Sequence, residues 1–213
     1  MRTRRNPSTR IGRRPTTTRD RIAAVGIDLF AARGFDDTSV DDIAEAAGIA
    51  RRTFFRYFPS KNAVPWGDFD AHMSEMRTML AETPADMSIL DSLVSVVLAF
   101  NSFPPEVAEG HRRRMELIFV VPALQAYSVV MYDGWRRVIA EYVAQRLGLE
   151  PTDQLPKTVG YLMLGVALGA YETWLTDESL DLIDLISQGS RVLYTGLADL
   201  HEPLLNGAAH HDA

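Results

Sequence analysis

The sequence predicts an all-α fold of about nine helices. Apolar residues recur at a spacing of three to four through most of the chain, and no segment has the alternating pattern of a β-strand. Glycine and proline mark the breaks between helical segments. Hydrophobic residues make up 46% of the 213 residues, which is enough for a packed core. A break near residue 65 divides the chain into a small N-terminal unit and a larger helical unit.

The first segment, residues 1–16, holds six arginines and no acidic residue, and it lacks apolar periodicity. We expect it to be a disordered basic arm, and residues 203–213 to be a disordered tail. Thr17 and Asp20 have the spacing of a capping box, which opens the first helix. Gly34 ends that helix. Its core-facing stripe consists of Ile22, Val25, Leu29 and Phe30.

Two short helices follow within the unit 17–64. Ser39 starts a helix over 40–47, and a second helix over 51–57 stops before Pro59. The three-residue turn that begins at Gly48 makes this pair a helix-turn-helix, and Gly48 supplies the positive φ that the turn requires. The apolar residues that should pack this pair on the first helix are Ile43, Ala44, Ala47, Ile49, Phe54 and Phe58.

The remaining unit, residues 65–202, is predicted to be entirely helical. A helix that begins near Ser60 should bend at Pro65 and continue from Trp66 to Glu82. Five longer helical segments should follow, separated by prolines, glycines and polar clusters. Their approximate ranges are 87–100, 105–121, 122–148, 155–176 and 180–200.

The outer face of the segment 51–57 has the chemistry of a recognition helix. Arg51 and Arg52 lie at its N-terminus, where such helices approach base edges, and arginine is the commonest specific reader of guanine. Phe55 offers an apolar contact to a base. We expect contacts to phosphates or sugars from Thr38, Ser39, Thr53, Arg56, Tyr57 and Lys61.

Charge is distributed unevenly along the chain. Residues 1–61 hold 13 basic and 7 acidic side chains, whereas residues 62–213 hold 9 basic and 21 acidic ones. A basic end on an acidic body is typical of a protein that contacts nucleic acid with one end. The alternative from another class is a helical protein-interaction module whose helix-turn-helix does not read DNA.

Several other classes find no support in the sequence. There is no cysteine, which excludes disulfides and thiolate sites and agrees with a cytoplasmic location. No secretory signal is visible, and the uncharged stretch 158–171 is too short to span a membrane. Phosphate-binding glycine loops, nucleophile elbows and zinc-binding histidine motifs are missing. We therefore expect neither an enzyme nor a cofactor or metal, and no membrane partner.

The string TSVDDIAEAAGIARRTFFRYFPSK resembles the DNA-binding module of TetR-type transcriptional regulators. It has their aromatic pair and their F-P-x-K stop, and a glycine ends the preceding first helix; the likeness covers residues 18–64. The family often has glycine or proline where this chain has Arg52, which leaves the operator sequence in doubt. The resemblance implies a homodimer on a palindromic double-stranded operator, with a small-molecule effector bound in the body.

The resemblance also implies roles for residues of the body. A lipophilic effector should lie among aromatic and methionine side chains of the central helices, and the last two long helices should form the dimer interface. The expected ligand-binding residues are Phe100, Met115, Phe119, Tyr127, Met131, Trp135 and Tyr171. The expected interface residues are Leu162, Gly165, Leu168, Gly169, Ile186, Leu193 and Leu197.

Two further stretches, FFRYFPSKNAVPWGDFD and RRRMELIFVVPALQAYSVVMYDGWRRVIAEYVAQRLG, resemble the TetR-type regulators found with mycofactocin biosynthesis genes in actinobacteria. This likeness implies a repressor of a redox-cofactor pathway with a long-chain acyl-CoA as its effector. Arg112, Arg113 and Arg114 would then either meet the anionic CoA moiety or form a solvated helix face. Effector binding should tilt the helix that begins near Ser60.

Overall fold

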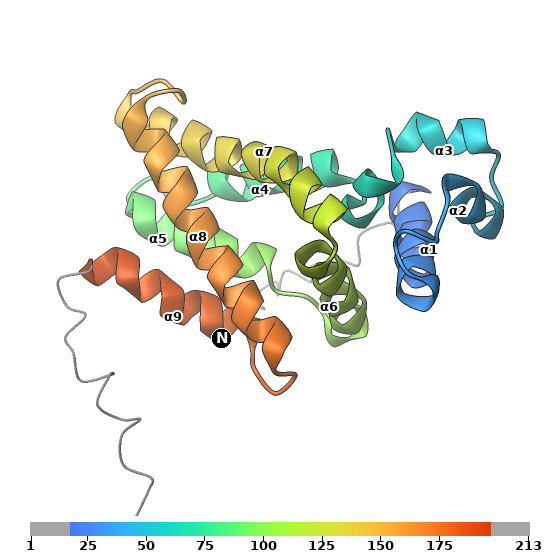
Figure 1. The fold of residues 1–213 in the computed structure, drawn as a ribbon. Helices are drawn as coiled ribbons and strands as arrows, with labels where there is room; N and C mark the ends of the chain where they lie inside the picture. The colour runs from blue at the N-terminus through green and yellow to red at the C-terminus, as the bar shows by residue number, and fades with distance from the viewer. Residues whose placement is uncertain (1–17, 197–213) are drawn as a thin grey trace, which may run out of the picture.

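The structure, a computed structural model, describes residues 18–196. Within this range the chain forms α-helices and one 3-10 helix, and no strand occurs there (Figure 1). This confirms the predicted all-α fold. The expected basic arm, Thr17 and the expected C-terminal tail lie outside the described residues.

The N-terminal unit, here called the reader, consists of α1 (Thr18–Arg33), α2 (Val40–Ala46) and α3 (Arg51–Tyr57). Gly34 has a φ of 90° and Gly48 a φ of 67°, so both glycines turn the chain where the sequence predicts. The apolar residues predicted to hold α2 and α3 on α1 do form one cluster. Its fully buried members include Ile22, Phe30, Ile43 and Phe54.

The connection from the reader to the body differs from the prediction. In place of one bent helix, the chain forms a 3-10 helix, η1 (Lys61–Trp66), and then a separate helix, α4 (Phe69–Ala81). Pro65 lies inside η1, where its ring and missing N–H are incompatible with continuing α-helical hydrogen bonds. Gly67 follows with a φ of 55°, which ends η1 before α4 begins.

The body adds five helices, and their bounds lie within a few residues of the predicted ones. These are α5 (Ile89–Phe100), α6 (Pro105–Val120), α7 (Pro122–Leu147), α8 (Gln154–Thr176) and α9 (Leu182–Thr195). The two longest, α7 and α8, cross each other, with α4 and α5 behind them and α9 alongside α8 (Figure 1). Their inward side chains form a second apolar cluster, here called the body core.

The body also packs directly on the reader. Side chains from the end of α6 and the start of α7, including Leu117, Val121 and Leu124, belong to the cluster of the reader. Arg113 of α6 lies 3.2 Å from the carboxylate of Asp28 on α1. A displacement of α6 or of η1 will therefore change the contacts that these helices make with the reader.

No single helix among residues 18–196 is long and apolar enough to cross a membrane. Only α6 and α7 taken together reach that length and composition, and the pair is bent by 103°.

Candidate nucleic-acid interface

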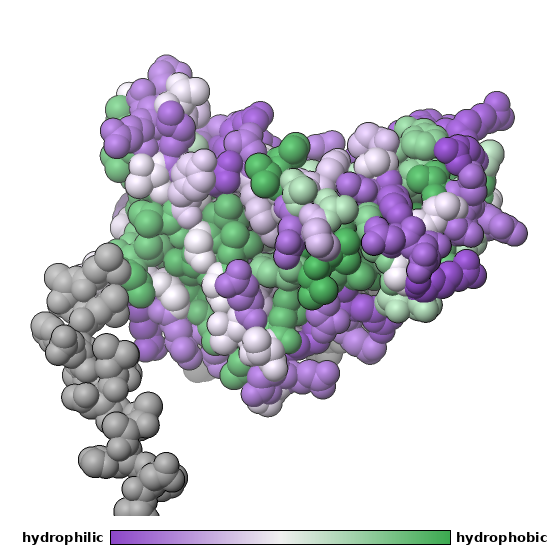
Figure 2. Space-filling model, viewed as in Figure 1, coloured by the Kyte–Doolittle hydropathy of each residue, from purple (hydrophilic) through white to green (hydrophobic). Residues whose placement is uncertain are grey.

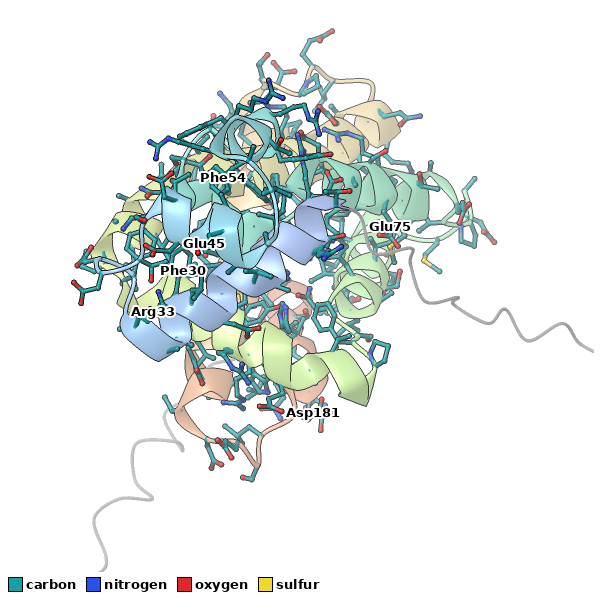
Figure 3. All side chains as sticks on the ribbon, turned by 90° about the vertical axis from the view of Figure 1, so that its right-hand side faces the viewer. Phe30, Arg33, Glu45, Phe54, Glu75 and Asp181 are labelled. Carbon is teal, nitrogen blue, oxygen red and sulfur yellow. The ribbon has the colours of Figure 1, made fainter. Side chains whose placement is uncertain are left out.

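The short helix α3 has one buried side, which fixes its position, and one exposed side. Phe54 is fully buried and packs on Phe58 with ring centroids 5.6 Å apart, whereas the neighbouring Phe55 is 46% exposed. The inner side therefore anchors α3 to α1 and α2, and the outer side faces solvent. Figure 1 shows α3 at the end of the molecule farthest from α8 and α9, and Figure 3 looks onto this end.

Arg51 and Arg52, at the first positions of α3, are both exposed. The guanidinium of Arg51 lies 5.3 Å from the ring centroid of Phe55 and pairs with the carboxylate of Asp41 on α2. Exposed ion pairs contribute little, so a nucleic acid can replace Asp41 at low cost. The exposed side of α3 thus presents two cations and one aromatic ring close together.

The second turn of α3 continues the same surface. Arg56 is exposed, and its guanidinium lies 4.9 Å from the ring centroid of Tyr57. It donates a hydrogen bond of 3.2 Å to the Tyr57 hydroxyl, and this bond lowers the pKa of that hydroxyl. Thr53 is half-buried beside them. The donors predicted on α3 therefore lie on one accessible face.

Ser39, in front of α2, is exposed but forms a capping box with Asp42. The backbone N–H of Ser39 donates to the Asp42 carboxylate at 2.8 Å, and the Asp42 backbone N–H donates to the Ser39 hydroxyl at 3.1 Å. The hydrogen bond from the Ser39 hydroxyl is the first cause that lowers the pKa of Asp42. The box starts α2 at the residue that the sequence predicts.

Thr38 does not fit its predicted role. Its side chain is completely buried, and its hydroxyl donates to the carbonyl of Gly34 at 2.7 Å. The hydroxyl therefore stabilises the turn between α1 and α2 and is not available to a phosphate. The prediction of a hydroxyl contact at Thr38 is wrong.

Lys61 also has a different role from the predicted one. Its ammonium donates to the carbonyls of Phe35 at 2.7 Å and Thr38 at 3.0 Å, with Asp36 at 3.4 Å. It also lies 4.3 Å from the ring centroid of Phe35. All three ammonium hydrogens thus have acceptors within the protein. Lys61 ties η1 to the α1–α2 turn, and its contact to the DNA backbone stays a prediction.

The predicted ligand-binding residues only partly share one location. Three of them, Met115, Trp135 and Tyr171, are buried in the body core, and Phe100 and Phe119 pack against it. Tyr127 does not join them, because it packs on the cluster of the reader at the start of α7. Met131 is half-buried and lies in neither cluster.

A polar chain that the sequence analysis missed crosses the body core. The Tyr171 hydroxyl donates to Asn101 Oδ1 at 2.7 Å and lies 2.7 Å from His111 Nε2. Burial, with the positive charge of Arg114 as the next cause, lowers the pKa of His111 to about 3. A signal was present, because His111 lies four residues before Met115 and seven before Ile118, on the buried stripe of α6.

The residues predicted to form the dimer interface differ in how exposed they are. Leu162 is 51% exposed, and a Cβ placed on Gly165 or Gly169 would meet no atom within 4 Å. Leu168 and Leu193 are partly buried against the body core. Ile186 is completely buried within the chain, so its prediction as an interface residue is wrong, and Leu197 lies outside the described residues.

An apolar groove borders this face. It has a volume of about 290 Å³ and runs between the ends of α5, α7, α8 and α9. Its walls include Leu147, Leu155, Leu162 and Leu193. Hydrophobic residues gather over the same helices in the space-filling view, whereas the reader is mainly hydrophilic (Figure 2). A surface of this kind is typical of a protein–protein interface.

Between residues 18 and 196, no group of three or more histidine, aspartate or glutamate side chains could hold a metal ion. The described part of the chain therefore presents one surface suited to a duplex, one apolar face and a partly polar interior.

Comparison with known proteins places this geometry in a family. Residues 22–64 match the family model described as "Bacterial regulatory proteins, tetR family", and residues 87–198 match the one described as "MftR C-terminal domain". The chain is 51% identical over 193 residues to the "Putative mycofactocin biosynthesis transcriptional regulator MftR" of Mycobacterium tuberculosis (strain ATCC 25618 / H37Rv). That alignment covers 91% of this chain and 98% of the relative.

Solved structures share the fold. The fatty acid degradation regulator FadR from Bacillus halodurans has a TM-score of 0.61 at 17% identity, over 88% of this chain and 98% of its own. Thermus thermophilus FadR, a repressor solved with lauroyl-CoA, has a TM-score of 0.52 at 23% identity, over 87% and 97%. Such relatives are regulators and not enzymes. The chain therefore belongs to the TetR family of bacterial transcriptional regulators, with an N-terminal helix-turn-helix domain and an MftR-type C-terminal domain.

Proposed function

We propose that the chain is a homodimeric repressor of mycofactocin-type genes, and that a long-chain acyl-CoA bound in the body releases it from its operator. The observation that supports this most strongly is the 51% identity to the MftR protein of M. tuberculosis over nearly its whole length. The fold itself can hold such a ligand, because the T. thermophilus FadR structure contains lauroyl-CoA.

The proposed DNA contacts come from the exposed face of α3. Arg51 and Arg52 approach base edges, Phe55 touches a base, and Arg56 and Tyr57 contact the backbone. Thr53 on α3 and the exposed N-terminus of α2 at Ser39 add phosphate contacts.

The proposed dimer pairs the apolar faces of α8 and α9 with those of a second copy. Gly165 and Gly169 leave room on α8 for a close approach of the partner helix, since a Cβ there meets nothing within the chain. Two readers would then face successive major grooves of one operator.

The proposed switch runs through the contacts between body and reader. Arg113 joins α6 to Asp28, and Arg19 of α1 lies 3.2 Å from Asp68, between η1 and α4. A ligand that shifts α6 against α4 changes the angle of both readers. Effector and operator must then weaken each other's binding by the same factor.

The experiment is a titration of a fluorescently labelled duplex from upstream of the chain's own gene, with and without oleoyl-CoA. We expect the Kd of the duplex to rise at least about tenfold with the acyl-CoA, a coupling of about 1.4 kcal/mol. Replacing Arg51 with Ala should weaken the ligand-free complex by about 1–3 kcal/mol. An acyl-CoA that binds the protein but leaves the Kd of the duplex unchanged contradicts the switch.

A further inference from the structure

Two nitrogen donors in the interior have no acceptor among the residues that the structure describes. These atoms are Nε of Arg114, on α6, and Nε1 of Trp66, at the end of η1. Both groups can only donate, so nothing but an acceptor can satisfy them. A buried donor without a partner is rare in a native protein, and each one calls for an explanation.

The three consecutive arginines of α6 differ in their surroundings. Arg112 lies over the ring of Trp174 at 4.2 Å, and Arg113 pairs with Glu109 at 2.7 Å as well as with Asp28. Arg114 forms no ion pair with a described residue, although its Nε is enclosed and burial lowers the pKa of its guanidinium. An arginine stays protonated in a protein, so the guanidinium keeps its positive charge here. The carboxylate of Asp20 on α1 attracts this charge, but the Nε hydrogen itself has no acceptor among the described residues.

The polar chain beside Arg114 does not neutralise this charge. The amide Nδ2 of Asn101 donates to the Val97 carbonyl at 2.8 Å, which fixes Oδ1 as the acceptor for Tyr171. The single hydroxyl proton of Tyr171 is therefore used, and His111 Nε2 must carry the proton that it donates to Tyr171. All three members are neutral groups that hold the wall of the site in place.

Trp66 brings the second donor to the same interior. Its ring packs edge-on against Phe69 at 5.8 Å and against Tyr132 at 5.5 Å between ring centroids. Tyr132 is close enough to Tyr171 for its charge to affect the pKa of the Tyr171 hydroxyl. The surrounding side chains belong to the body core, so a ligand held by both donors would contact mainly apolar side chains.

We propose that Arg114 anchors the anionic headgroup of the effector, and that Trp66 Nε1 donates to a second acceptor on the same molecule. The ligand class is an amphipathic anion, an apolar chain with a carboxylate or phosphate headgroup. The inference rests on the proposed function, because it places the headgroup of that effector. It also explains how the ligand could act on the reader. The headgroup would draw α6 and η1 together, and both elements pack on the reader.

The test compares three probes with the same C18 chain: oleate, oleoyl-CoA and the neutral oleyl alcohol. Binding to the full chain is measured by calorimetry for wild type, Arg114→Gln and Arg137→Gln, the control at an exposed arginine of α7. We expect Arg114→Gln to weaken the anionic probe by about tenfold or more and to change the alcohol by less than about twofold. Arg137→Gln should change neither. Oleate and oleoyl-CoA show which headgroup the site prefers.

A second variant, Trp66→Phe, removes one donor and keeps the aromatic ring. It should weaken the anion about threefold or more without affecting the alcohol, and it keeps the test open if Arg114→Gln does not fold. Anion affinities unchanged in Arg114→Gln, or in Trp66→Phe where the first variant is unfolded, overturn the inference. So does a wild-type chain that binds no anionic probe. Arg114-dependent binding that leaves operator affinity unchanged supports this site and refutes the proposed switch instead.

Discussion

Lys61 has the charge and position expected of a phosphate contact, yet in the structure its ammonium forms hydrogen bonds within the protein. From its position after α3, the residue should reach a phosphate, because a sequence does not show which carbonyls the chain brings near. In the structure the turn between α1 and α2 offers carbonyls from Phe35, Asp36 and Thr38 at hydrogen-bonding distance. The ammonium therefore stabilises the reader before any DNA is bound.

Replacing Lys61 with Gln should lower the free energy of unfolding by about 1.5–3 kcal/mol, the range for hydrogen bonds to a charged group. Urea denaturation of the full chain measures this change, and Lys157→Gln, at an exposed position on α8, is the control. A variant with unchanged stability but a shallower salt dependence of DNA binding would restore Lys61 as a phosphate contact.

His111 gives the interior a pH dependence. Its pKa is about 3 in the folded chain and near 6.5 in the unfolded chain, so the unfolded state takes up a proton that the folded state refuses. The contribution of neutral His111 to the free energy of unfolding is therefore complete above about pH 6.5 and is lost as the pH falls toward 3. Between those values the free energy of unfolding should fall by up to about 1.4 kcal/mol per pH unit.

Thermal or urea unfolding between pH 7.5 and 5 checks this slope against His111→Gln. The variant keeps a side-chain donor but has no titrating ring, so its slope should be smaller by that amount. Equal slopes for the two proteins would show that His111 binds protons equally in the folded and unfolded states, so that its pKa is not lowered by folding.

Among the elements, the helices were predictable and the connection to the body was not. Apolar periodicity and capping residues gave every helix within a few residues, because these signals are local. The break at Gly67 and the 3-10 form of η1 depend on packing against α1, which no local pattern reports. At Gly26 of α1 a Cβ would lie 2.5 Å from Val64 Cγ1, so α1 and η1 meet where only glycine fits.

Replacing Gly26 with Ala should therefore destabilise the chain by about 1–3 kcal/mol through overpacking. Gly110→Ala is the opposite control, because a Cβ at that position of α6 meets nothing within 4 Å. It should stabilise the helix by about 0.5–1 kcal/mol. Denaturation curves of both variants that moved in the same direction would refute the close packing of α1 on η1.

At the level of the whole molecule, the sequence predicted the functional surfaces more reliably than the individual residues that form them. The outer side of α3 and the apolar side of α8 were identified from residue type and spacing. Ile186 was misplaced because a single amphipathic stripe does not tell an internal core from a subunit interface. Asn101 and His111 escaped notice because their shared partner, Tyr171, lies on another helix, far away in sequence.

The proposed dimer makes a prediction for Leu162, which is 51% exposed on α8. Replacing it with Asp places two charges in the interface of a symmetric dimer, where neither finds a partner. We expect light scattering after gel filtration to give the mass of a monomer, with loss of operator binding. Ser74→Asp, at an exposed position on α4, should remain dimeric; a dimeric Leu162→Asp would place the interface elsewhere.

The decisive experiment selects duplexes from a random pool with the purified chain at low ionic strength. A dimer that inserts α3 of each copy into a major groove should enrich a two-fold symmetric sequence, with half-site centres about one helical turn or a multiple apart. The double variant Arg51→Ala and Arg52→Ala should not enrich it. If wild type enriches no sequence and binds no duplex, the outer face of α3 is not a DNA-reading surface.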